Sequence, residues 1–153
     1  MIYLREAKNS DLELIMAWRS NPLVYEGFYT QTEPLKWEEH FNWWKSRNKD
    51  WREFIIVLDD EDRPRNVGVV TIVQLDHWSP EIGYFIGEVS LWGQGIGKEV
   101  VQLAMDWLKS RGYQYCHTTV LKTNLRALNL LKSLGWKILG DARKEELWLT
   151  KRM

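Results

Sequence analysis

Three glycines spaced two residues apart, Gly93, Gly95 and Gly97, lie near the middle of the chain within the stretch WGQGIGK at 92–98. The preceding residues, Glu81–Ile86, have the composition of a strand, and after the turn apolar residues recur at helical spacing. Glycine lets a backbone approach a ligand closely, and free N–H groups at a helix start attract anions. The stretch is therefore a candidate phosphate-binding loop, although its glycines also fit an ordinary tight turn.

A second candidate segment follows one strand–helix unit later, at residues 124–136. Asn124 can cap a helix, and Gly135 followed by Trp136 can end it. An ordinary amphipathic helix would explain each of these residues separately. It would not explain their pairing with the glycine turn, so we interpret the two segments together.

Together the two segments resemble motifs of the GNAT superfamily of acyl-CoA-dependent N-acyltransferases. Gly95 and Gly97 match its pyrophosphate loop, R/Q-x-x-G-x-G/A, but Trp92 stands at the R/Q position. Trp-Gly-x-Gly is similar to the branch of ribosomal-protein N-terminal acetyltransferases and amino-sugar (pseudaminic-acid-type) N-acetyltransferases. The second segment resembles N-x-x-A-x-x-h-Y-x-x-x-G-F, and five residues match it: Asn124, Ala127, Leu130, Gly135 and Trp136.

The resemblance implies acetyl-CoA as co-substrate and no metal. Backbone N–H groups at the glycine turn would bind the pyrophosphate on a helix that starts near Gln94. The strand before the turn would separate from its neighbour, so that its end polarises the thioester and pairs with the pantetheine. The implied coenzyme-binding residues are Phe85, Ile86, Gly87, Trp92, Gly93, Gln94, Gly95, Ile96, Gly97, Lys98, Asn124 and Ala127.

Transfer of an acetyl group to an amine also needs a proton acceptor. Glu81 lies on the strand that enters the predicted active centre, where related enzymes often have a glutamate that acts through water. A carboxylate at the start of a strand can equally be a surface residue. Three histidines are competing candidates, although each can also be structural: His40, His77 and His117.

The proton donor for the leaving thiolate departs from the family pattern. The family often has a tyrosine seven residues after the motif asparagine, and this chain has Leu131 there. A hydrocarbon cannot donate a proton, so Tyr84, Cys116 or water substitutes, or the thiolate leaves without a dedicated acid. We therefore predict Glu81, Tyr84 and Asn124 as the catalytic residues.

Aromatic residues are concentrated in the first third of the chain, which suggests a wall around a ligand or a partner. Residues there resemble a pattern of amino-sugar N-acetyltransferases, namely Asp11, Leu12, Trp18–Pro22, Glu39, His40 and Trp43. Of these we predict four as acceptor-binding: Trp18, Arg19, His40 and Trp43. Core packing would also explain the tryptophans. We expect the acceptor to be a primary amine. A nucleotide-linked amino sugar is one candidate, and a protein N-terminus is another. A non-catalytic module that binds coenzyme A is the third hypothesis.

Composition bounds the remaining possibilities. Acidic and basic residues each number 21 among 153, which gives no support for binding nucleic acid or an anionic membrane. The single cysteine excludes an internal disulfide and favours a reduced, cytoplasmic location. We see no secretory signal and no apolar run long enough to cross a bilayer. We expect one domain over residues 1–153, as a monomer or a homodimer.

The hydrophobic pattern predicts an α/β (α+β) fold in which two helices follow the first strand and three strands come next. A strand–helix–strand unit predicts one parallel pair in a mixed, mostly antiparallel sheet of about seven strands, with helices on both faces. The predicted strands are 3–7, 54–58, 67–75, 81–86, 115–121, 137–139 and 145–151, the last two around a turn at Gly140-Asp141. The predicted helices are 11–19, 34–47, one ending at 111–112, and 124–134, with a loop or broken helix at 23–32 and turns at 59–64 and 76–80.

Overall fold

A computed structural model describes residues 1–28, 31–61 and 63–153 and contains one seven-stranded sheet in the order β1-β2-β3-β4-β5-β7-β6. The strands are β1 (Ile2–Glu6), β2 (Arg52–Asp60), β3 (Arg63–Val73), β4 (Glu81–Ile86), β5 (Tyr115–Leu121), β6 (Lys137–Arg143) and β7 (Glu146–Arg152). The helices are η1 (Asn9–Asp11), α1 (Leu12–Arg19), α2 (Pro22–Tyr25), α3 (Trp37–Ser46), η2 (Val89–Leu91), α4 (Ile96–Ser110) and α5 (Leu125–Ser133). This is the predicted mixed fold.

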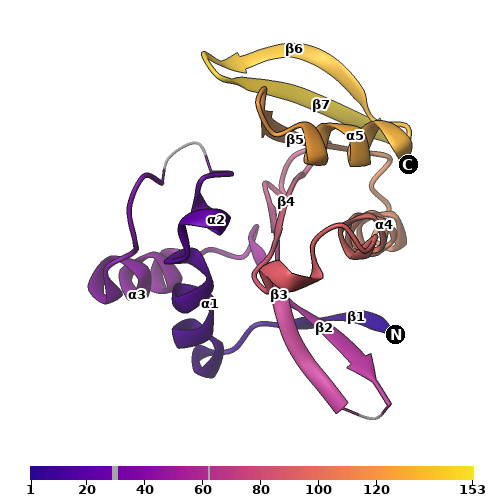
Figure 1. The fold of residues 1–153 in the computed structure, drawn as a ribbon. Coiled ribbons are helices and arrows are strands. Elements are labelled where there is room, and N and C mark those ends of the chain that lie inside the picture. The colour runs from indigo at the N-terminus through magenta and orange to yellow at the C-terminus, as the bar shows by residue number, and fades with distance from the viewer. Residues whose placement is uncertain (29–30, 62) are drawn as a thin grey trace.

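The sheet is antiparallel except where β4 and β5 run parallel. These two strands are in register at Glu81 and His117, near their N-terminal ends. The segment that connects β4 to β5 contains α4, as expected for a crossover connection between parallel strands. Helices α4 and α5 cover one face of the sheet, and α1, α2 and α3 lie on the other (Figure 1).

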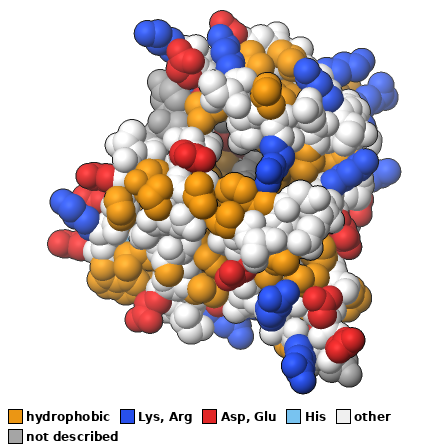
Figure 2. Space-filling view, in the orientation of Figure 1, with side chains coloured by type: hydrophobic (Ala, Val, Ile, Leu, Met, Phe, Trp, Pro, Cys, Tyr) orange, Lys and Arg blue, Asp and Glu red, His pale blue; other side chains and the backbone are white. Residues whose placement is uncertain are grey.

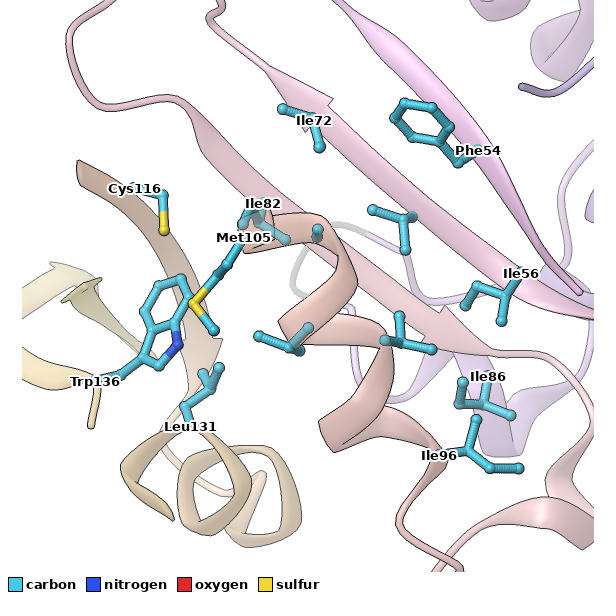
Figure 3. Packing of buried hydrophobic residues seen from close by; sticks show 14 of the residues in the cluster. Phe54, Ile56, Ile72, Ile82, Ile86, Ile96, Met105, Cys116, Leu131 and Trp136 are labelled. Carbon is cyan, nitrogen blue, oxygen red and sulfur yellow. The ribbon is translucent and has the colours of Figure 1, made fainter. Parts of the chain in front are cut away.

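The larger core lies between the sheet and α4. Alternate residues of β4, Ile82 and Ile86, point into it and meet the apolar face of the helix, including Val100 and Leu108, which are fully buried. Ile86 at the end of β4 and Ile96 at the start of α4 lie together, which brackets the glycine turn with apolar packing (Figure 3). Full burial of one such side chain contributes about 1.5–3 kcal/mol to the free energy of unfolding.

A smaller core holds α1 on the opposite face. Ile15 and Trp18 of α1 pack on alternate residues of β2 and β3, and Phe85 of β4 packs against the same cluster. The backbone of Gly87 approaches the Trp18 ring so closely that a Cβ there would lie 2.2 Å from Cγ of the indole. Only glycine fits this contact, which seats α1 at the end of β4.

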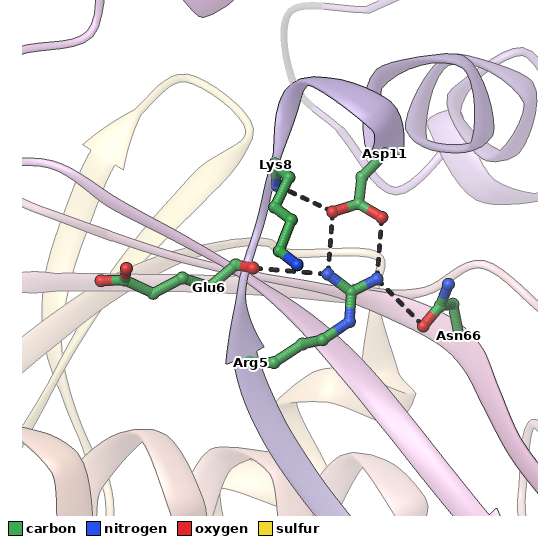
Figure 4. A network of polar contacts seen from close by, with 5 residues as sticks. All are labelled: Arg5, Glu6, Lys8, Asp11 and Asn66. Atoms are coloured by element: carbon green, nitrogen blue, oxygen red, sulfur yellow. Dashed lines mark hydrogen bonds and ion pairs between the residues drawn. The ribbon is translucent and has the colours of Figure 1, made fainter.

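The start of α1 is fixed to the sheet by a polar network. Arg5 of β1 donates two hydrogen bonds to the carboxylate of Asp11, at 2.9 and 2.7 Å, and a third to Asn66 of β3 at 3.2 Å (Figure 4). The backbone N–H of Lys8 donates to the same carboxylate at 2.8 Å. These charge-assisted bonds hold the pKa of Asp11 below its ordinary value, the hydrogen bond from Arg5 being the largest cause.

Several predicted boundaries were wrong. β2 runs to Asp60 and β3 starts at Arg63, so four residues of the predicted turn at 59–64 lie in strands. Helix α3 begins at Trp37 rather than near Pro34, because its N-cap Lys36 has an extended backbone, with φ −90° and ψ 140°. Gly140 lies inside β6 at an irregularity of register instead of forming the turn, which instead falls at 144–145. Part of the predicted loop at 23–32 and of the turn at 59–64 falls on Tyr29, Thr30 and Asp62, outside the described residues. In the described part of the chain no helix could span a membrane.

Candidate active site

A cleft of about 1000 Å³ opens between β4 and β5 where the two strands separate. Its walls come from both strands, the glycine turn, the start of α4, and α5, with the end of α2 closing one side. A hollow on one face of the molecule is bordered by hydrophobic side chains and by a Lys or Arg side chain (Figure 2). The separation of the parallel strands thus creates the space that the sequence predicted for a coenzyme.

The glycine turn presents its backbone to this cleft. Gly93 and Gly95 have φ angles of 80° and 82°, which side chains rarely adopt, and a Cβ at either position would meet no atom within 4 Å. Gly95 is the N-cap of α4, so the helix starts at Ile96, two residues after the predicted Gln94. Since no side chain caps it, its first N–H groups are free to bind an anion, and the 15-residue helix adds its dipole.

Trp92 ties the turn to the end of β4. Its indole Nε1 donates a hydrogen bond to the Ile86 carbonyl at 2.9 Å, and the guanidinium of Arg126 lies over its ring at 5.3 Å. Arg126, from α5, lines the cleft beside the turn and was missed by the sequence analysis, although it stands two residues after Asn124. Gln94, Lys98 and Gly87 are not among the described residues that line the cleft.

Helix α5 packs against the start of α4 at Gly97. A Cβ there would lie 2.9 Å from Cδ1 of Leu130 and 3.5 Å from the hydroxyl of Tyr84. Burial raises the pKa of Tyr84 to about 12, so its hydroxyl stays protonated at neutral pH. Tyr84 lines the cleft and keeps a proton available.

Asn124 caps α5 and also lines the cleft. Its side-chain oxygen accepts a hydrogen bond from the Ala127 N–H at 3.2 Å, and both residues face the cavity with Thr123. Leu131 lies in the core beside them and offers no proton. Cys116 packs in the same core and is not among the described residues that line the cleft, so it is not placed to give a proton to a thiolate there; burial raises its pKa to about 12.

Glu81 lies at the inner end of the cleft, where β4 and β5 are still paired. Its carboxylate lies 3.6 Å from Nε2 of His117, whose other ring nitrogen contacts Ser79 Oγ at 3.3 Å. His117 therefore lies beside Glu81 on the neighbouring strand. His77 contacts the backbone of Ser79 in the preceding turn and does not reach the described lining of the cleft.

The fold brings two of the four predicted acceptor residues to one cavity. Arg19 and Trp43 both line a smaller cavity of about 210 Å³, and Arg19 also lines the main cleft beside it. Trp18 and His40 pack in the interior and do not line either cavity in the described part of the chain. Burial lowers the pKa of His40, whose Nε2 binds the Leu12 carbonyl at 3.0 Å, so it joins α3 to α1.

The smaller cavity has a wall that the sequence analysis missed. Glu53 is 5% exposed and accepts hydrogen bonds from Trp51 Nε1 at 2.8 Å and from Thr71 Oγ1 at 2.6 Å. Burial, the largest influence, raises its pKa above the ordinary value for a carboxyl group. The sequence did contain a signal for Glu53, because this carboxylate stands directly before an apolar run, Phe54–Val57.

A splayed parallel pair, with a glycine turn that opens a helix beside it, defines the class of acyl-CoA-dependent N-acyltransferase folds. The acetyltransferase (GNAT) domain family matches residues 2–137, and the chain belongs to this family. In the described residues, no group of three or more His, Cys, Asp or Glu side chains is arranged to hold a metal ion.

Relatives agree with this assignment. The chain is 48% identical over 150 residues to the uncharacterized protein MJ1062 of Methanocaldococcus jannaschii, covering 97% of this chain but only 30% of that protein's length. It is 28% identical to the acetyltransferase PseH of Campylobacter jejuni, over 89% of this chain and 83% of PseH.

Solved structures agree as well. A domain from Methanocaldococcus jannaschii superposes with a TM-score of 0.96 and 45% identity, covering 100% of this chain and 99% of that one. Spermidine N-acetyltransferase from Vibrio cholerae, in complex with coenzyme A and spermine, has a TM-score of 0.82 at 17% identity, over 99% and 95% of the two chains. At 17% identity, this structural similarity shows a shared fold and no more.

Proposed function

We propose that this chain transfers an acetyl group from acetyl-CoA to a primary amine. The observation that carries the proposal is the continuous cleft from the glycine turn to the separation of β4 and β5. It offers a free helix start for phosphates at one end and unpaired strand edges for an amide-bearing arm in the middle.

The coenzyme would lie with its pyrophosphate on the N–H groups at the start of α4, near Gly95–Lys98. Its pantetheine would run between the strands along Phe85 and Ile86, beside Asn124 and Ala127. Arg126 is the cation that lies nearest this path on α5 and would add a charge contact. The thioester would then reach the inner cleft, where Glu81 lies.

Acetyl transfer removes two protons from an ammonium nitrogen. One must leave before attack, because only the neutral amine has a free lone pair, and one leaves as the amide forms. Glu81, beside His117, would take one proton through water. The thiolate would take a proton from the Tyr84 hydroxyl or from water, with Asn124 orienting the pantetheine arm near the sulfur.

The test combines coenzyme binding with turnover. We expect the purified protein to bind coenzyme A in calorimetry and to release free thiol from acetyl-CoA with at least one amine of a mixed panel. Glu81→Gln should lower kcat about 100-fold without changing coenzyme affinity. Glu145→Gln, on an exposed residue at the β6–β7 turn, is the control. Coenzyme binding with no transfer to any amine would instead identify a non-catalytic module.

We further propose a nucleotide-linked amino sugar as the acceptor. The N-terminal pattern that resembles amino-sugar N-acetyltransferases and the aromatic wall from Phe28, Trp43 and Trp51 favour a sugar or base that stacks on rings. A protein N-terminus is the second candidate, because a peptide could use the same wall. Nucleotide-linked amino sugars and peptides with free N-termini are therefore separate arms of the panel, and the higher kcat/KM decides between them.

A further inference from the structure

Three strands place Glu53, Thr71 and Gly83 in one row across the sheet. Glu53 of β2 is opposite Thr71 of β3, and Thr71 is opposite Gly83 of β4. Residues opposite one another in antiparallel strands share a face of the sheet. Phe85 lies on that same face, where it packs against α1, so the row faces α1 and α3.

Gly83 leaves an open space in the middle of this row. A Cβ at Gly83 would find only the Thr71 carbonyl oxygen near it, at 4.0 Å, so the protein's own packing does not require a glycine there. The smaller cavity occupies this space and shares a wall with the large cleft through Arg19, Thr71, Gly83 and Phe85. It therefore adjoins the place where the thioester would lie.

Glu53 supplies the negative charge in this cavity. It takes part in none of the ion pairs found among the described residues, and its two oxygens each accept one neutral hydrogen bond. Arg19 on α1 and Arg47 at the end of α3 face it at longer range. A buried carboxylate without a contacting cation is costly, and aromatic rings beside it are a suitable environment for an ammonium ion.

We infer that the smaller cavity is the acceptor subsite, where the Glu53 carboxylate binds the acceptor's ammonium group and takes one proton from it. This assignment rests on the proposed acetyl transfer, and the group recognised is a primary ammonium. The bond between a proton and the ammonium nitrogen breaks, and an O–H bond forms on Glu53. The neutral amine then attacks the thioester carbonyl, and a C–N bond forms as the C–S bond breaks. The second proton of the amine leaves through water to Glu81, and the leaving thiolate takes a proton from Tyr84 or from water. Glu53, Glu81 and Tyr84 return to their starting protonation states by exchange with solvent after release of the amide.

The hydrogen bonds around Glu53 suit both of its protonation states. The Trp51 indole can only donate, so it stays bonded to Oε2 in either state. The Thr71 hydroxyl can donate to Oε1 or accept from it. A proton can therefore arrive at Oε1 without breaking either bond, and the raised pKa favours its transfer to this carboxyl group.

The test measures kcat/KM for the best amine of the panel, across a pH series, together with calorimetric affinity for coenzyme A. We expect Glu53→Gln to lower kcat/KM for the amine about 100-fold near neutral pH and to leave coenzyme affinity unchanged. The loss should shrink as pH approaches the amine's own pKa, because the neutral amine needs no proton acceptor. Glu53→Asp should keep more activity than Glu53→Gln. Glu13→Gln, on the exposed side of α1, is the matched control and should match wild type.

Gly83→Ala tests the cavity independently of Glu53. Its methyl group enters open space, so the fold and the coenzyme affinity should persist while KM for the amine rises about tenfold. Normal amine kinetics in Glu53→Gln, or an equal loss at every pH, would overturn the assignment of Glu53 while leaving the proposed function intact. A wild-type protein that transfers to no amine would overturn both.

Discussion

The indole N–H of Trp92 donates to the carbonyl of Ile86 at 2.9 Å. This bond joins the glycine turn to the last residue of β4 and gives a structural reason for tryptophan where the family pattern has Arg or Gln. Trp92 thus stabilises the backbone of the turn through a neutral hydrogen bond and contributes no charge there.

Trp92→Phe should weaken coenzyme A binding about five- to tenfold, because the ring remains but its bond to Ile86 is lost. Calorimetry with coenzyme A measures the change. Trp78→Phe is the control, since Trp78 is 67% exposed in the turn before β4 and lies outside the described cleft lining. Equal affinity in Trp92→Phe and wild type would show that the turn holds its conformation without this bond.

Gly95→Asp should abolish coenzyme binding while the protein stays folded. The new carboxylate would stand at the anion-binding start of α4 and repel the pyrophosphate, yet no protein atom lies within 4 Å of its Cβ.

Gly112→Asp is the matched control for Gly95→Asp. Gly112 follows the other end of α4, has a φ of 91° and likewise has no atom within 4 Å of a built Cβ. Both variants carry the same backbone strain, about 1–3 kcal/mol, but only one meets the coenzyme. Similar melting temperatures with a loss of affinity confined to Gly95→Asp would support the assignment, and unchanged affinity in Gly95→Asp would contradict it.

Local sequence signals account for the coenzyme side of the site. The strands Glu81–Ile86 and Tyr115–Leu121 were predicted with their observed ends, because alternation and glycine turns are read within a few neighbouring residues. The glycine turn and the Asn124 cap are equally local. The bond from Trp92 to Ile86 and the position of Arg126 beside the turn needed the folded chain to be found.

The acceptor side could not be read in this way. Glu53, Thr71 and Gly83 meet because three strands pair in one register, and no spacing in the sequence shows that register. Conversely, Trp18 and His40 matched a pattern but line neither cavity in the described part of the chain, since the sequence cannot show which side of α1 or α3 faces the sheet.

Asp11→Asn should destabilise the fold by about 2 kcal/mol at pH 7, because Arg5 loses two charge-assisted bonds in a mostly buried place. The pKa of Asp11 is lowered in the folded state, so its stabilisation is present above the unfolded value of 3.8 and disappears as pH falls through the folded value. Thermal melts at pH 7 and pH 2.5 should therefore show a difference that shrinks in acid. Asp60→Asn, whose contact with Arg65 is exposed at 3.9 Å, should change little at either pH.

Glu53→Gln should stabilise the protein at neutral pH while it impairs turnover. The pKa of Glu53 is raised in the folded state, so this carboxyl group favours folding only while protonated, and that contribution disappears as pH rises through the folded pKa. At pH 7.5 the buried charge is a cost that a neutral amide lacks. Gln can accept from Trp51 and donate to Thr71, which preserves both hydrogen bonds.

We expect the melting temperature of Glu53→Gln to exceed that of wild type by about 2–4 °C at pH 7.5, equivalent to about 1 kcal/mol. The two proteins should melt together near pH 4, where both side chains are neutral. A variant less stable than wild type at pH 7.5 would mean that the charge of Glu53 is needed for packing and not retained for a ligand. If Glu53 binds the amine, the variant should gain stability and lose turnover, because the cation that balances the Glu53 charge is present only when the amine is bound.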